Sequence, residues 1–84
     1  MITVEIKDAN QISEGRAEIE IYCDLEGLAD LTRQLAFLMK DESHVHLATP
    51  AWAGNELDET VNGKGNVLVH QLTIIARVQK TGSI

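Results

Sequence analysis

Alternating apolar and polar residues predict two strands at the start of the chain. Residues 2–7 alternate with a period of two, which is typical of a strand with one buried face. The apolar positions there are Ile2, Val4 and Ile6, and the polar ones are Thr3, Glu5 and Lys7. After a loop over residues 8–15, residues 16–24 alternate in the same way. The residues expected to face inward there are Ala17, Ile19, Ile21 and Cys23. Two such strands joined by a modest loop predict an antiparallel hairpin.

The next apolar residues recur at helical spacing and predict a helix over residues 25–40. The side expected to form the main source of core comprises Leu28, Leu31, Leu35, Leu38 and Met39. Asp24 is the expected N-cap, and Lys40 suits the negative end of the helix dipole. Phe37 falls on the opposite side, which it shares with Glu26, Asp30 and Arg33. It is either covered by a later loop or an exposed anchor for a partner.

The second half of the chain predicts two or three further strands. Residues 43–48 form one, with Val45 and Leu47 inward and with His44 and His46 outward, and Thr49-Pro50 ends it. A short strand around residues 56–61 is expected to pair with the last strand through a turn at residues 62–65. The last strand, 66–78, is apolar on both faces and therefore central. Its first face comprises Leu68, His70, Leu72, Ile74, Ala76 and Val78.

These elements predict one α+β domain over residues 1–84. One helix packs on a mostly antiparallel sheet of four or five strands, in the order β-β-α-β-(β)-β, which is the simplest two-layer solution.

Charge narrows the choice of partner. Thirteen acidic and seven basic residues give a net charge of −6, which makes nucleic acid and anionic membranes poor partners and a basic protein an acceptable one. Residues 1–42 hold ten acidic and four basic residues, so the whole excess lies there. It is either chance on a solvated face or a docking face. The first residues lack the pattern of a signal peptide and no apolar run is long enough for a membrane span, so we expect a cytoplasmic protein.

Histidines and a cysteine are the candidates for chemistry. His44 and His46 lie two apart on one strand face, as a chelating pair requires, and Glu18 or Glu20 could join them if the second strand were adjacent. The same groups could form an acid–base pair. The single Cys23 excludes an internal disulfide and is expected to be a small hydrophobe rather than a nucleophile. A small metal-binding or hydrolytic protein is therefore the alternative; we expect no enzyme activity and no cofactor.

The only tryptophan, Trp52, lies in the long loop beside Pro50 and Gly54. It is either a lid that folds back over one end of the core or a binding hot spot, for which tryptophan is among the enriched residues.

Residues 44–57 read HVHLATPAWAGNEL and follow Gly27-Leu28 and the leucine-rich helix. This segment resembles the immunity protein 32 family, short α+β proteins assigned, largely by gene neighbourhood, as antidotes to bacterial polymorphic toxins. The likeness extends over residues 25–72 in the order of elements, although Ala53 stands where a second glycine beside Gly54 is expected. The resemblance implies no catalytic residue. The motif positions that it implies are His44, His46, Trp52, Gly54 and Glu56.

Together with the one-sided charge, this resemblance implies a small acidic immunity protein that neutralises a cognate toxin by steric and electrostatic occlusion. Acidic residues of the second strand and the helix would steer a basic surface toward the chain. The expected partner-binding residues are Glu18, Glu20, Tyr22, Glu26, Asp30, Phe37, His44, His46, Trp52 and Glu56. A homodimer with a self-complementary sheet face is a third hypothesis.

Overall fold

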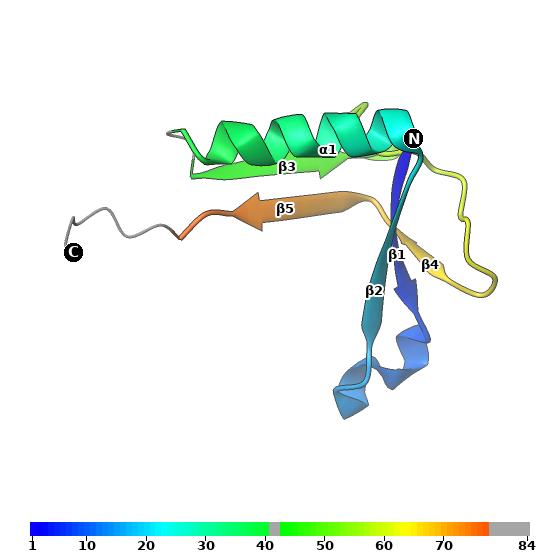
Figure 1. The fold of residues 1–84 in the computed structure, drawn as a ribbon. Helices are drawn as coiled ribbons and strands as arrows, with labels where there is room; N and C mark the ends of the chain where they lie inside the picture. The colour runs from blue at the N-terminus through cyan, green and yellow to red at the C-terminus, as the bar shows by residue number, and fades with distance from the viewer. Residues whose placement is uncertain (41–42, 78–84) are drawn as a thin grey trace.

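The computed structural model describes residues 1–40 and 43–77, which form one α-helix and two antiparallel sheets. In the first sheet β1 (Ile2–Lys7) lies between β2 (Glu18–Cys23) and β4 (Val67–Val69). The second sheet pairs β3 (His44–Ala48) with β5 (Gln71–Ile75). Helix α1 (Leu25–Leu38) lies over β3, while the β1–β2 hairpin extends away from it (Figure 1). The α+β class and the order of elements agree with the prediction, and the expected sheet is divided in two. The prediction that the last strand is central is wrong, because β4 and β5 are both edge strands among the residues described.

The division of the sheet occurs at His70, where the predicted last strand bends. Before the bend Val69 pairs with Val4 and shares its face, whereas after it Leu72 pairs with Leu47 and faces the helix. The inward positions therefore change from odd to even numbers at His70. The prediction that Leu68 shares a face with Leu72 is wrong, because Leu68 pairs with Glu5 on the polar face of the first sheet. Val78, the last residue of the predicted strand, lies outside the described residues.

The core is supplied mainly by strands and one loop. Its buried apolar residues are Ile2, Val4, Leu38, Val45, Leu47, Ala48 and Leu57. The helix lies directly against the start of β1: a Cβ on Gly27 would overlap the carbonyl oxygen of Met1. This contact turns Gly27, Leu31 and Leu38 toward the sheets.

The predicted core face of the helix is therefore wrong at three of its five residues. Leu28, Leu35 and Met39 are 50%, 43% and 84% exposed. The helix begins after Asp24, whose Oδ1 accepts the Gly27 N–H at 2.8 Å as the expected N-cap, and it ends at Leu38 rather than near residue 40. Phe37 is 52% exposed, as its position opposite the predicted core face suggests.

The part of the β1–β2 hairpin that lies away from the helix is not packed against the core. Ile19 and Ile21 of β2, both expected to face inward, are 54% and 46% exposed, and Ala17 is exposed as well. Cys23, at the helix end of the same strand, does pack against the core. The predicted loop between β1 and β2 contains a 3-10 helix, η1 (Ala9–Glu14).

The long loop after β3 contains no strand over residues 53–66. It opens with a 3-10 turn, η2 (Pro50–Trp52), and is then fixed by three acidic side chains that accept backbone N–H groups. Glu56 accepts from Ala48 at 3.1 Å, Asp58 from Ile2 at 3.0 Å and Glu59 from Ala51 at 2.8 Å. The predicted strand over residues 56–61 is thus wrong, because these residues bond outward to three separate segments rather than to one neighbouring strand.

Candidate functional site

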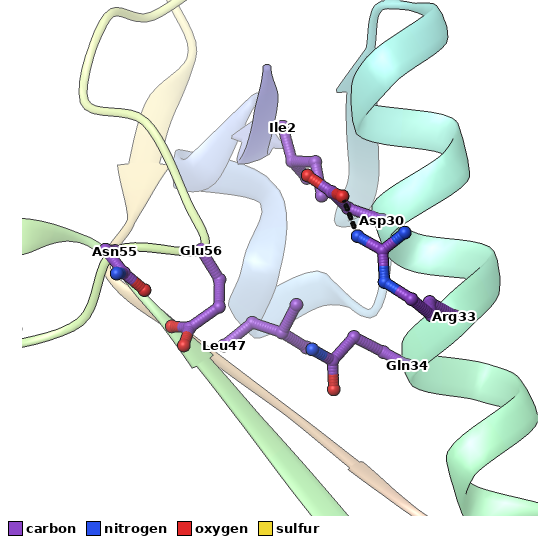
Figure 2. Close-up of a pocket in the computed structure, with 7 residues that line it drawn as sticks. All are labelled: Ile2, Asp30, Arg33, Gln34, Leu47, Asn55 and Glu56. Carbon is purple, nitrogen blue, oxygen red and sulfur yellow. Dashed lines mark hydrogen bonds and ion pairs between the residues drawn. The ribbon is translucent and has the colours of Figure 1, made fainter.

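A pocket of about 200 Å³ lies between α1, the end of β3 and the long loop (Figure 2). The buried side chains of Ile2 and Leu47 form its apolar base. Its remaining lining is polar or charged and comprises Asp30, Arg33, Gln34, Asn55 and Glu56. The pocket therefore combines an apolar surface with groups of both charges, a combination that fixes the orientation of a bound group.

The helix supplies one wall through residues spaced three and four apart. Asp30, Arg33 and Gln34 lie on one flank of α1, beside the buried stripe of Leu31 and Leu38. Arg33 donates a hydrogen bond to Asp30, so that these two charges neutralise each other (Figure 2). The helical period places Glu26 and Phe37 on the same flank. This flank is therefore acidic with one exposed aromatic ring.

The loop supplies the opposite wall and a carboxylate. One oxygen of Glu56 accepts the Ala48 N–H, and this bond holds the side chain over the end of β3. Among the described residues, no lysine or arginine forms an ion pair with Glu56. Because Asp30 and Arg33 compensate each other, Glu56 leaves the pocket with a net negative charge. Such a pocket suits a long cationic side chain, whose methylene groups would lie on Ile2 and Leu47.

The far part of the long loop is anchored by a buried carboxylate, Glu5. The side chain is fully buried and accepts hydrogen bonds from Thr3 Oγ1 (2.6 Å), the N–H groups of Asn62 (2.8 Å) and Gly63 (2.9 Å), and Asn66 Nδ2 (2.8 Å). Burial raises the pKa of Glu5, but these donors outweigh it and lower the pKa from 4.5 to about 2. The turn at residues 62–65 therefore closes over a charge rather than joining two strands.

The glutamates and tyrosine predicted on β2 lie away from the pocket, on the polar face of the first sheet. Glu20 accepts hydrogen bonds from Asn66 Nδ2 (3.0 Å) and the Tyr22 hydroxyl (2.8 Å), and these bonds lower its pKa. The bond to Glu20 raises the pKa of Tyr22. Glu18 is exposed. Two of these three predicted partner-binding residues thus belong to the network around Glu5.

The two predicted histidines lie on the other face of the second sheet from α1. Their rings meet edge to face with centroids 4.9 Å apart, and His46 Nδ1 lies 2.9 Å from Thr73 Oγ1. No group of three or more histidine, cysteine or acidic side chains able to hold a metal ion occurs among the described residues. Glu18 and Glu20 belong to the first sheet, so β2 is not adjacent to the histidine strand, which was the condition for these glutamates to join the pair.

Trp52 does not fold back as a lid over the core, which was one of the two interpretations of its place in the loop. The indole is 60% exposed and stacks on the ring of His70, with centroids 6.3 Å apart and planes parallel within 1°. His70 is held in turn by Thr49, whose Oγ1 lies 2.7 Å from His70 Nδ1. Trp52 therefore marks the bend between β4 and β5 and contributes nothing to the pocket.

The structure thus divides the ten predicted partner-binding residues among separate surfaces. Asp30 and Glu56 meet at the pocket, and Glu26 and Phe37 extend it along the helix flank. Sequence reasoning missed Arg33, Gln34 and Asn55 as pocket residues. The i, i+3 and i+4 spacing of Asp30, Arg33 and Gln34 was a visible signal for the helix wall, whereas nothing in the sequence brings the loop to that wall.

No protein-family model matches the chain, and no curated protein or solved structure matches it either. Within the described part of the chain, no helix has the length and apolar character needed to cross a membrane.

Proposed function

We propose that this chain is an immunity-type protein that binds a basic protein toxin through the pocket and the acidic helix flank beside it. The observation that carries the proposal is the negative, apolar-based pocket, into which an arginine or lysine side chain of the toxin would insert. The resemblance of residues 44–57 to the immunity protein 32 family supports the same function. Glu56, one of the motif positions of that resemblance, is the pocket's uncompensated carboxylate.

The proposed mechanism is occlusion rather than catalysis. Glu26 and Glu56, which within the described residues are not compensated as Asp30 is by Arg33, would steer a positively charged surface toward the helix flank, and Phe37 would provide apolar contact area. The bound chain would then cover the surface that the toxin uses to act on its substrate. The proposal includes a bacterial cytoplasm as the location, where such a protein would meet its toxin.

Calorimetric titration with the protein encoded in the adjacent reading frame tests this function. We expect 1:1 binding per chain, weakened at least about tenfold by Glu56→Gln, because a desolvated interfacial charge pair is lost. Glu14→Gln is the matched control, since it removes one negative charge from η1, outside the pocket and the α1 flank. Absence of binding, or equal weakening by the two variants, would contradict the proposal.

A further inference from the structure

Helix α1 leaves its second flank uncovered. Leu28, Leu35 and Met39 lie on the flank opposite the pocket, with Leu31 and Leu38 between the two flanks. These three side chains are 43–84% exposed, although their spacing is that of a buried helix face. The helix therefore carries two apolar stripes, of which the protein's own core covers one.

The uncovered flank lies on the same side as β5. The N–H and C=O groups of Ala48 bind Glu56 and Leu57, so the long loop and the pocket lie beside the edge of β3 that faces away from β5. The opposite flank of the helix consequently lies on the β5 side. There Leu72 and Ile74 face the helix layer and are only partly buried. We call Leu28, Leu35, Met39, Leu72 and Ile74 the apolar step.

The backbone of β5 is also unpaired along its outer edge within the part of the chain that is described. Hydrogen bonds from Thr49 N–H to His70 and from Ala76 N–H to Ser43 continue the β3–β5 ladder at the two ends of β5. On the β5 side, both bonds involve an even-numbered residue. Because bonded and non-bonded pairs alternate in an antiparallel ladder, the N–H and C=O groups of Gln71, Thr73 and Ile75 point to the outer edge.

The outer edge of β5 lacks the features that usually prevent an exposed strand from pairing with another chain. Residues 71–75 read QLTII and contain no charge, glycine or proline. By contrast β2, one outer strand of the first sheet, carries Glu18 and Glu20, and β4, the other, is only three residues long. Charged residues on a free edge usually prevent it from pairing with another chain. An uncharged edge beside an apolar step therefore has the features of a surface that pairs.

We propose that the outer edge of β5 pairs antiparallel with β5 of a second copy of this chain, about a two-fold axis at Thr73. In this register Thr73 lies opposite its own copy and Gln71 lies opposite Ile75, which gives three hydrogen-bonded pairs. Leu72 and Ile74 then form the intervening closer pairs, on the face that the helices share. The result is a continuous four-stranded sheet, β3-β5-β5-β3, with both helices on one face and the two apolar steps meeting across the axis.

The distribution of charge favours a second copy over the basic toxin as the occupant of this edge. β5 contains no charged residue, and the other residues that the helical period places on this flank of α1, Leu25, Thr32 and Ala36, are uncharged as well. The charged residues of α1 lie on its other sides. A basic partner would gain no electrostatic attraction at β5, and two acidic copies meet there with little local repulsion. No pocket residue belongs to the apolar step or to β5. The dimer therefore leaves both pockets open.

Sedimentation analysis of the wild-type chain at about 100 µM should give twice the 9.2 kDa mass of one chain. Leu35→Glu should raise the dimer dissociation constant at least about tenfold by placing a charge in the joined steps. Phe37→Glu, the same substitution at comparable exposure on the opposite flank of α1, should leave the dimer intact. Thr73→Pro should also dissociate it. This change removes the exposed side-chain hydrogen bond to His46 but no backbone β3–β5 bond, because the Thr73 N–H points outward. Circular dichroism confirms folding of each variant.

Hydrogen exchange of the wild-type chain gives an independent result that needs no variant. The amide protons of Gln71, Thr73 and Ile75 should exchange slowly in the dimer and rapidly on dilution below the dissociation constant. A single-chain mass at about 100 µM would overturn the proposal. So would a dimer in which the Thr73 amide exchanges rapidly. A dimer that fails to bind the neighbouring protein would refute only the proposed toxin binding, and a monomer that binds it would refute only this inference.

Discussion

Replacing Glu5 with glutamine tests whether one buried charge holds the long loop to the first sheet. The carboxylate accepts four close hydrogen bonds, whereas a glutamine would turn an NH₂ group toward donors such as the Asn62 and Gly63 N–H. The shift of the Glu5 pKa from 4.5 to about 2 corresponds to at most about 3 kcal/mol at neutral pH. Because glutamine keeps one acceptor oxygen for these donors, we expect Glu5→Gln to lose about 2 kcal/mol of this stabilisation.

The expected loss depends on pH in a defined direction. The folded-state pKa of Glu5 is lower than its unfolded value, so its contribution is complete above about pH 5 and is lost as the pH falls toward 2. The difference in unfolding free energy between the wild type and Glu5→Gln should therefore be about 2 kcal/mol at pH 7 and should shrink steadily below pH 5. Other carboxylates titrate in both proteins, so the difference isolates Glu5.

Urea unfolding followed by circular dichroism at several pH values between 7 and 2 measures this difference. Glu18→Gln is the matched control: it removes a charge from the same sheet but from an exposed side chain, and it should change stability little. A wild-type advantage over Glu5→Gln that stays constant from pH 7 to pH 2 would refute the role assigned to the charge. An advantage below about 0.5 kcal/mol at pH 7 would refute the anchoring itself.

Three further substitutions test the positions that shape the loop and the helix, each by denaturant unfolding. Ala53→Gly should stabilise the protein by about 0.5–1 kcal/mol, because Ala53 has a left-handed φ of 66° that glycine adopts without strain, and a loss of stability would contradict this. Gly27→Ala, ordinarily stabilising within a helix, should destabilise here because the new Cβ would meet the Met1 carbonyl; a gain would show that the helix can move away. Leu57→Ala should cost about 3 kcal/mol by opening a cavity, whereas Val61→Ala in the same loop should cost little, and equal costs would contradict the burial of Leu57.

Local patterns were sufficient for most of the elements. The alternation of Val45 and Leu47 with His44 and His46 defined β3 and its inward face, and Asp24 marked the start of α1. These features depend on residues close together in the chain, where the period and the N-cap act directly. The α+β class followed from the order of those elements.

Long-range contacts account for what the sequence did not reveal. The inward face of α1 is set by the approach of Gly27 to the Met1 carbonyl, and a helical wheel of leucines contains no information about that contact. Likewise, the polar face of β1 was expected to lie toward solvent, but Thr3 and Glu5 are fully buried because residues 62–66 close over them. A buried carboxylate is recognisable only once its donors are placed.

The candidate site shows the same difference between local patterns and long-range contacts. Asp30 was predicted as a partner-binding residue for its charge and Glu56 as a motif position of the family resemblance, and the structure brings both to one pocket. The histidines and Trp52 lie elsewhere, because β3 separates its two faces and because Trp52 stacks on His70 at the bend. Charge and residue type identified candidates, while the path of the loop decided which of them meet.

Mapping the bound surface tests the central claim most directly. The protein encoded in the adjacent reading frame would be titrated into the isotope-labelled chain, and amide chemical shifts would be followed. We expect the largest changes at Asp30, Arg33, Gln34, Asn55 and Glu56, with smaller changes along the Glu26–Phe37 flank. Changes confined to the His44 and His46 face, with the pocket residues unaffected, would contradict binding through the pocket.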